Sequence, residues 1–104
     1  MLFNALNSRQ YHESHIPGFR TSPLWGENGD GAYFAEFKQG VTFPLHDHDD
    51  TEQIYLVSGH MRFGAVEMLP GDFLKVVHGD AHTGFALADS VIFVTHTGGL
   101  IMQE

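Results

Sequence analysis

Short runs of β-branched and aromatic residues alternate with turn-forming residues along most of this chain. The clearest runs span 32–38, 52–59, 72–77 and 90–96, and glycine, proline, aspartate or asparagine bounds them. Such runs favour strands, and the residues between them favour turns because they adopt positive φ or preset the backbone. No stretch of ten or more residues carries a helical period. The pattern therefore predicts an all-β fold, either a sandwich or a small barrel.

A single domain is expected, because 104 residues supply one hydrophobic core and not two. Residues 1–17 show no clear period, so we expect an N-terminal arm or a leading strand there. Residues 18–104 carry the strand-like runs and are expected to form the β-barrel domain. No linker, low-complexity tract or internal repeat divides this region.

Charge and composition exclude several classes of function. The chain has no cysteine, which rules out disulfides, thiolate zinc sites and cysteine nucleophiles. A formal net charge of -8 opposes binding to phosphate backbones and anionic lipids, so we expect neither a nucleic-acid nor a membrane partner. The start of the chain lacks a signal-peptide pattern, and no apolar stretch approaches the roughly 18 residues that cross a bilayer. A cytoplasmic protein is expected.

A histidine-rich segment provides the strongest candidate site. His46 and His48 are two positions apart, so on a strand both side chains leave the same face. With eight histidines in the chain, about 0.6 such pairs are expected by chance. Requiring Gly40, Glu52 and Gly59 at their spacing lowers the chance figure to roughly 0.0005. The longer pattern therefore indicates a functional site.

Residues 40–59 resemble the first motif of the cupin superfamily and match it at every specified position. Residues 71–86 resemble the second motif, with three residues at the family spacing: Gly71, Gly79 and His82. Val77 and Ala86 stand where proline and asparagine are usual. The connection between the two motifs, residues 60–70, is short for a cupin. In this it resembles the connection in a subgroup that includes zinc-binding cupin domains of anti-sigma factors and acetylacetone-cleaving dioxygenases. The resemblance implies a single small cupin-type β-barrel, jelly-roll-like, with two antiparallel sheets.

The same resemblance implies that His46, His48, Glu52 and His82 bind one divalent transition metal per chain. Glu52 is an even number of positions from both histidines of its motif, so it points inward with them if the intervening residues keep strand phase. Three imidazoles and one carboxylate suit Fe, Zn, Mn, Ni, Co or Cu and do not suit calcium. An octahedral ion would keep two open positions, whereas tetrahedral zinc would be fully coordinated.

The resemblance implies several functions toward a small-molecule substrate or ligand. The first is a mononuclear non-haem, iron-type dioxygenase acting on a small substrate with carbonyl or enol oxygens, in which Glu52 also serves as an acid or base. The alternatives are a zinc-binding module that senses a ligand or oxidant, and a non-redox metal-dependent lyase or isomerase acting on a sugar-like substrate. The family habit and the exposed strand edges of a small barrel imply a homodimer.

Residues around the motifs carry further expectations. Asp47, Asp49 and Asp50 are expected to face solvent. His78 is expected in a turn, where it either is structural or lines the mouth of the site as a hydrogen-bond donor or proton carrier. His96 ends a strand-like run and is either a core residue or part of the pocket wall. The core is expected to include most phenylalanines of the strand-like runs, namely Phe34, Phe37, Phe43, Phe63, Phe73, Phe85 and Phe93.

Overall fold

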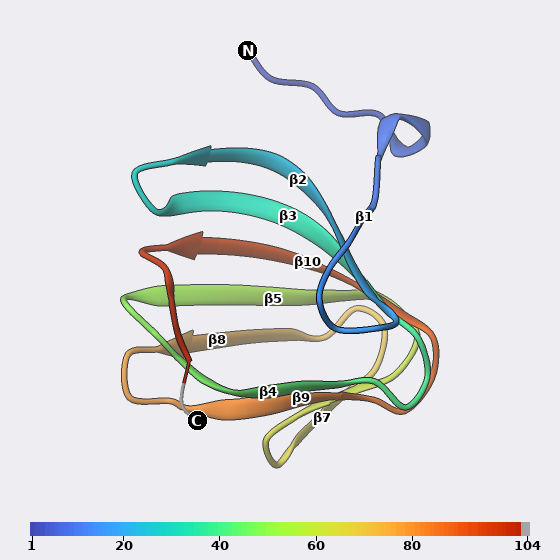
Figure 1. The fold of residues 1–104 in the computed structure, drawn as a ribbon, viewed down its shortest axis with the longest axis vertical. Coiled ribbons are helices and arrows are strands. Elements are labelled where there is room, and N and C mark those ends of the chain that lie inside the picture. Colours follow the sequence, from blue (N-terminus) through green and yellow to red (C-terminus); the bar gives the residue numbers. More distant parts are fainter. Residues whose placement is uncertain (103–104) are drawn as a thin grey trace.

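The protein, described here by a computed structural model of residues 1–102, is built almost entirely of strands (Figure 1). Apart from the 3₁₀ turn η1 (Leu6–Ser8), the elements of this part of the chain form two antiparallel sheets. The larger sheet has the order β1 (His12–Glu13), β2 (Phe19–Glu27), β3 (Asp30–Phe37), β10 (Ser90–Thr97), β5 (Thr51–Ser58) and β8 (Phe73–Val77). The smaller has the order β11 (Leu100–Met102), β4 (Thr42–His48), β9 (His82–Ala86), β6 (Met61–Phe63) and β7 (Val66–Met68).

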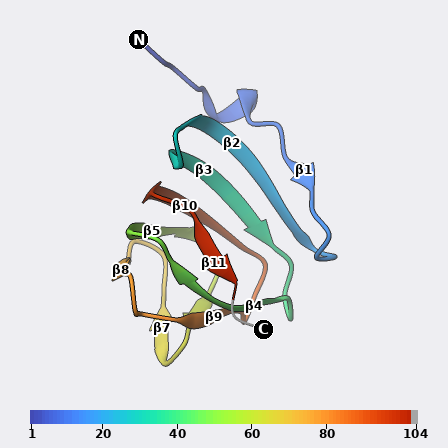
Figure 2. The same ribbon diagram turned by 60° about the vertical axis from the view of Figure 1, so that its left-hand side comes forward.

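The all-β fold and its two antiparallel sheets are confirmed, but the arrangement is a jelly-roll sandwich and not a closed barrel. Closing a barrel would require the edge strands of one sheet to hydrogen-bond to those of the other. Among the described strands, every pairing stays within one sheet. Figure 2 shows β11 beside β4 in the smaller sheet, and β1 beside β2 at the edge of the larger one.

The four runs singled out in the sequence correspond to β3, β5, β8 and β10, which are neighbours in the larger sheet. The sequence runs do not indicate β2, β4 or β9, because proline, glycine and polar residues interrupt them. The short connection at 60–70 forms the β6–β7 hairpin. Residues 1–17 contain only η1 and the two-residue β1, which pairs with β2. No helix of the described chain is long and apolar enough to cross a membrane.

The core lies between the two sheets and consists of alternate residues that each strand turns inward. The larger sheet contributes Ala35, Phe37, Ile54, Leu56, Ile92 and Val94, and the smaller contributes Met61, Phe63, Met68 and Ala86.

Four of the seven expected core phenylalanines are placed wrongly by the sequence argument. Phe73 is 60% exposed, because its strand turns Leu74 inward instead. The other three, Phe34, Phe85 and Phe93, also alternate with inward-facing residues and are only half-buried. The remaining three, Phe37, Phe43 and Phe63, pack in or against the core as expected.

Candidate metal centre

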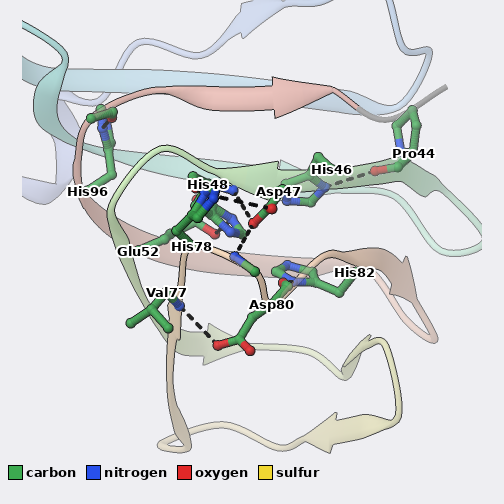
Figure 3. A network of polar contacts seen from close by, with 12 residues as sticks. Pro44, His46, Asp47, His48, Glu52, Val77, His78, Asp80, His82 and His96 are labelled. Carbon is green, nitrogen blue, oxygen red and sulfur yellow. Dashed lines mark hydrogen bonds and ion pairs between the residues drawn. The ribbon is translucent and has the colours of Figure 1, made fainter.

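Four polar side chains meet between the sheets, where an apolar core would otherwise continue (Figure 3). His46 and His48 come from β4, His82 comes from β9, and Glu52 comes from β5. All four are buried, and each offers a nitrogen or oxygen that lies within 4.8 Å of those of the others. The structure therefore brings together the four residues that the sequence motifs single out.

The local backbone explains this convergence. His46 and His82 are directly opposite each other in the β4–β9 pairing. After His48 the chain bends at Asp49 and Asp50 and enters the other sheet, so Glu52 faces the histidines from across the sandwich. The inward orientation expected for Glu52 is thus present, but it results from a change of sheet and not from unbroken strand phase.

Backbone carbonyls fix the tautomers of two of the imidazoles. The Nδ1 of His46 lies 2.9 Å from the carbonyl oxygen of Pro44, and the Nδ1 of His82 lies 2.9 Å from that of Asp80. A carbonyl oxygen only accepts hydrogen bonds, so each Nδ1 must carry a proton and donate it. The Nε2 of each neutral ring then keeps a free lone pair, the arrangement typical of metal-binding histidines.

Within residues 1–102, three buried ring nitrogens lack a hydrogen-bond partner, namely both nitrogens of His48 and the Nε2 of His82. His48 is only 2% exposed, and its Nε2 lies 2.9 Å from the Oε1 of Glu52 without hydrogen-bonding geometry. A buried polar atom without a partner costs about 1–3 kcal/mol, so such atoms are uncommon in native proteins. A cation that accepts one lone pair from His48 and one from the Nε2 of His82 would remove most of that cost. The group is therefore compatible with metal binding.

The protonation state of His46 suits the same role. Burial, the largest cause, lowers the pKa of His46 below its ordinary value of 6.5, and the neighbouring His82 lowers it further. The hydrogen bond to the Pro44 carbonyl and the carboxylate of Glu52 oppose this shift. The imidazole is consequently neutral near pH 7, which is the form that binds a metal ion.

The structure corrects the expectation for Asp47, which is 7% exposed and does not face solvent. Its Oδ1 accepts the backbone N–H groups of His48, at 2.7 Å, and of Gly79, at 2.9 Å. These two hydrogen bonds hold the pKa of Asp47 below its usual range. Because Gly79 lies in the turn that leads to His82, Asp47 ties together the two segments that carry the histidines. Asp49 and Asp50 are exposed, as expected.

His78 lies on the outside of this cluster. Its Nδ1 donates a hydrogen bond to the backbone carbonyl of His48 at 2.8 Å, and its side chain is 66% exposed. His78 lines neither of the two cavities that adjoin the cluster. Its contact with His48 therefore passes through the backbone, and a role in carrying protons stays a prediction.

Asp47→Ala is expected to weaken zinc affinity about 10–100-fold, the usual cost of removing a group that orients metal ligands. Asp47→Asn should lose less, because its amide oxygen still accepts both backbone N–H groups. Calorimetric titration of the metal-free proteins with zinc measures the effect, with Asp89→Ala as the matched control, because the exposed Asp89 also accepts a backbone N–H but lines neither cavity at the cluster. An unchanged affinity in Asp47→Ala would mean that this carboxylate does not position the ligands.

Two cavities adjoin the four-residue cluster. The inner cavity, about 30 Å³, has an apolar wall of phenylalanine and aliphatic side chains and contacts His46, His82 and Glu52. The mouth cavity, about 150 Å³, is lined by Tyr33, His48, Thr51, Glu52, His96, Thr97, Gly98 and Gly99. A water molecule needs about 10–15 Å³, so the inner cavity holds very small molecules and the mouth cavity holds larger ones.

Sequence reasoning missed Tyr33, which lines both cavities together with Glu52. Burial raises the pKa of Tyr33 well above its usual range, and the Glu52 carboxylate adds to the shift, so the phenol is a hydrogen-bond donor at neutral pH. Tyr33 lies inside a run of strand-forming residues, and nothing in that run predicts that its side chain lines the cavities. His96, whose location the sequence left open, is part of the mouth wall and donates from Nδ1 to the Gly98 carbonyl at 2.9 Å.

Similar structures support the fold. An RmlC-like cupin protein from Ralstonia eutropha is 16% identical with a TM-score of 0.85, and the match covers 96% of this chain and 70% of that one. An acetylacetone dioxygenase from Acinetobacter johnsonii is 15% identical with a TM-score of 0.85, over 100% of this chain and 77% of that one. A structure of Rhodobacter sphaeroides SigE in complex with the anti-sigma ChrR is 19% identical with a TM-score of 0.79, over 89% of this chain and 52% of that one.

At these identities the likeness shows a shared fold. A search of curated proteins finds no match. A family model described as the ChrR cupin-like domain matches residues 3–101, which is nearly the whole chain. This match agrees with both cupin motifs and with the jelly-roll sandwich. The chain therefore belongs to the ChrR cupin-like domain family of cupins.

Proposed function

We propose that this protein is a metal-dependent cupin, specifically a mononuclear non-haem, iron-type dioxygenase for a small substrate with carbonyl or enol oxygens. His46, His48, Glu52 and His82 would hold one divalent ion. The observation that carries the proposal is the buried cluster of three imidazoles and one carboxylate at the junction of two cavities, with ring nitrogens that have no hydrogen-bond partner in the described part of the chain. A redox-active ion bound there would supply electron transfer to dioxygen and an anchor for substrate oxygens.

The surrounding side chains fit this chemistry. Glu52 lines both cavities, so its carboxylate is placed to accept a proton from a carbon between two carbonyl groups. The phenol of Tyr33 lines the same two cavities and would donate a hydrogen bond to a substrate oxygen. The apolar wall of the inner cavity would exclude water from the reacting atoms. The fold shared with an acetylacetone dioxygenase is in keeping with this assignment.

Oxygen uptake tests the proposal. The protein, loaded with ferrous iron, is expected to consume dioxygen when small β-diketones or flavonols are added, and the metal-free protein and His48→Ala are expected to be inactive. Absence of turnover across such a panel with bound iron, manganese, cobalt, nickel or copper would contradict the dioxygenase assignment.

A zinc-binding sensing module is the second candidate, and the family match favours it. The family that matches this chain is named after the cupin-like domain of ChrR. One of the similar structures contains ChrR, which is described there as an anti-sigma protein in complex with SigE. Four protein ligands also complete a tetrahedral zinc site. Zinc as the only metal in the purified protein, four protein ligands by X-ray absorption and no oxygenase activity with iron would favour this candidate over the first.

We also propose that the chain forms a homodimer through the outer face of its larger sheet. Four aromatic residues lie opposite one another on adjacent strands there, in the order Phe34, Phe93, Tyr55 and Phe73. Tyr55 and Phe73 are exposed, and contiguous apolar surface of this kind marks interfaces. A twofold axis would pair this row with its copy. Light scattering should give twice 11.6 kDa, and a mass of 11.6 kDa at micromolar concentration would contradict the proposal. The cytoplasmic location stays a prediction.

A further inference from the structure

We infer that the mouth cavity selects uncharged keto or enol compounds and rejects their anionic counterparts, such as keto acids, uronates and phosphate esters. The inference rests on the proposed function, since it names the class of substrate for that same site. It is carried by the positions of all the basic residues and by the carboxylates that surround the mouth.

None of the five basic side chains of the protein reaches the centre. Arg9 lies over the ring of Phe34 at 3.5 Å, and Arg62 lies over the ring of Phe85 at 5.1 Å. Arg20 is paired with Glu36 and Glu13 at the far end of the larger sheet. These contacts hold all three arginines on the outside of the sandwich, away from the inner and mouth cavities.

The two lysines are equally remote. Lys38 follows the last residue of β3, whereas the mouth contacts that strand at Tyr33, five residues earlier and about 17 Å away along an extended backbone. Lys75 is exposed between Leu74 and Val76, which its strand turns inward, so Lys75 points outward. No lysine or arginine is therefore available to neutralise an anion in the mouth cavity.

Carboxylates instead support the outer wall of the mouth, which consists of Thr97, Gly98 and Gly99. The Oδ1 of Asp30 accepts the Gly98 N–H at 3.1 Å, and the Oδ2 of Asp50 accepts the Thr97 hydroxyl at 3.0 Å. The backbone N–H of Asp49 donates to the Gly99 carbonyl at 2.8 Å, which places a third carboxylate beside the same turn. Within the described chain, no salt bridge involves any of these three aspartates.

The balance of charge opposes anions. A divalent ion held by three neutral imidazoles and Glu52 would leave one net positive charge at the centre, against three aspartates at the outer wall. An anion entering the mouth would lose water and meet this negative field before reaching the ion. Besides the ligands His48 and Glu52, the side chains that line the mouth are the phenol of Tyr33, two threonine hydroxyls and the His96 imidazole, which can hydrogen-bond to a carbonyl oxygen; none of them is a lysine or an arginine.

A matched pair of ligands tests the inference with cobalt-loaded protein, whose visible spectrum reports binding without turnover. Pentane-2,4-dione is uncharged, and 3-oxobutanoate replaces one methyl ketone by a carboxylate. We expect the dione to bind at least about tenfold more tightly at low salt, and the preference to shrink as salt screens the aspartates. The salt series uses the unaltered protein, so it gives a result even if a substituted protein does not fold.

A charge added to the mouth provides the second arm. Thr97→Lys is expected to narrow or reverse the preference, because it places an ammonium group on the outer wall. Gln39→Lys adds the same charge at the exposed turn beyond the far end of β3 and is expected to leave the preference unchanged.

Two results would overturn the inference: equal or tighter binding of 3-oxobutanoate by the unaltered protein, or no spectral response to either ligand. The first of these would leave the dioxygenase proposal intact. Conversely, the dione could bind more tightly, as expected, while the iron-loaded protein consumes no oxygen. That result would contradict the dioxygenase proposal and support the selectivity for uncharged ligands.

Discussion

His48→Ala is expected to reduce the bound metal from about one ion per chain to less than about a tenth of an ion after dialysis. The imidazole of His48 is buried, and its nitrogens have no hydrogen-bond partner among the described residues. Removing a group that merely orients a metal ligand already costs about 10–100-fold in affinity, so loss of a ligand should cost more than about 100-fold. Elemental analysis after dialysis against a low concentration of zinc measures the effect.

His12→Ala is the matched control for this substitution, because His12 is exposed on β1 and away from the cluster. It should retain the full metal content. Circular dichroism of both variants establishes that they are folded. The account would be contradicted if folded His48→Ala kept one ion per chain, because the metal would then have to bind elsewhere.

Removal of the metal is expected to lower the melting temperature by at least about 15 °C. A ligand present at 1,000 times its dissociation constant stabilises the folded state by about 4 kcal/mol, and each kcal/mol shifts the melting temperature of a domain this small by about 4–8 °C. The reason lies in the metal-free cluster, where the His48 ring and the Nε2 of His82 have no hydrogen-bond partner among the described residues and would each gain a bond to the ion. Differential scanning calorimetry with a chelator, followed by addition of excess zinc, measures the loss and its recovery.

The control for this effect is the same experiment with His48→Ala, whose melting temperature should respond to neither chelator nor zinc. A melting temperature that is identical with and without metal in the unaltered protein would show that the cluster is stable without an ion.

The sequence was sufficient for the fold class and for the members of the candidate site. The strands β3, β5, β8 and β10 are neighbours in one sheet, and their continuous apolar and aromatic runs stand out from the turns. The four clustered residues were found because their spacing in two motifs is far more specific than any single histidine.

The remaining features depend on where the chain changes sheet and on which face each strand turns inward. The bend at Asp49 and Asp50 moves the chain from one sheet to the other, and no pattern in the neighbouring sequence predicts this change of sheet. The sequence predicts that Asp47 is exposed in an acidic loop. Its carboxylate instead accepts one backbone N–H from His48 on β4 and one from Gly79 in the turn between β8 and β9. Tyr33 and Phe73 both lie in aromatic runs, yet one lines the centre and the other lies outside.

Anomalous X-ray diffraction from crystals grown with zinc, recorded at the zinc absorption edge, tests the central claim most directly. We expect one peak per chain between the two sheets, at about 2.0–2.2 Å from a ring nitrogen of His46, His48 and His82 and from the Glu52 carboxylate. A peak only at a surface pair such as His60 and Glu67, with none between these four side chains, would contradict the account.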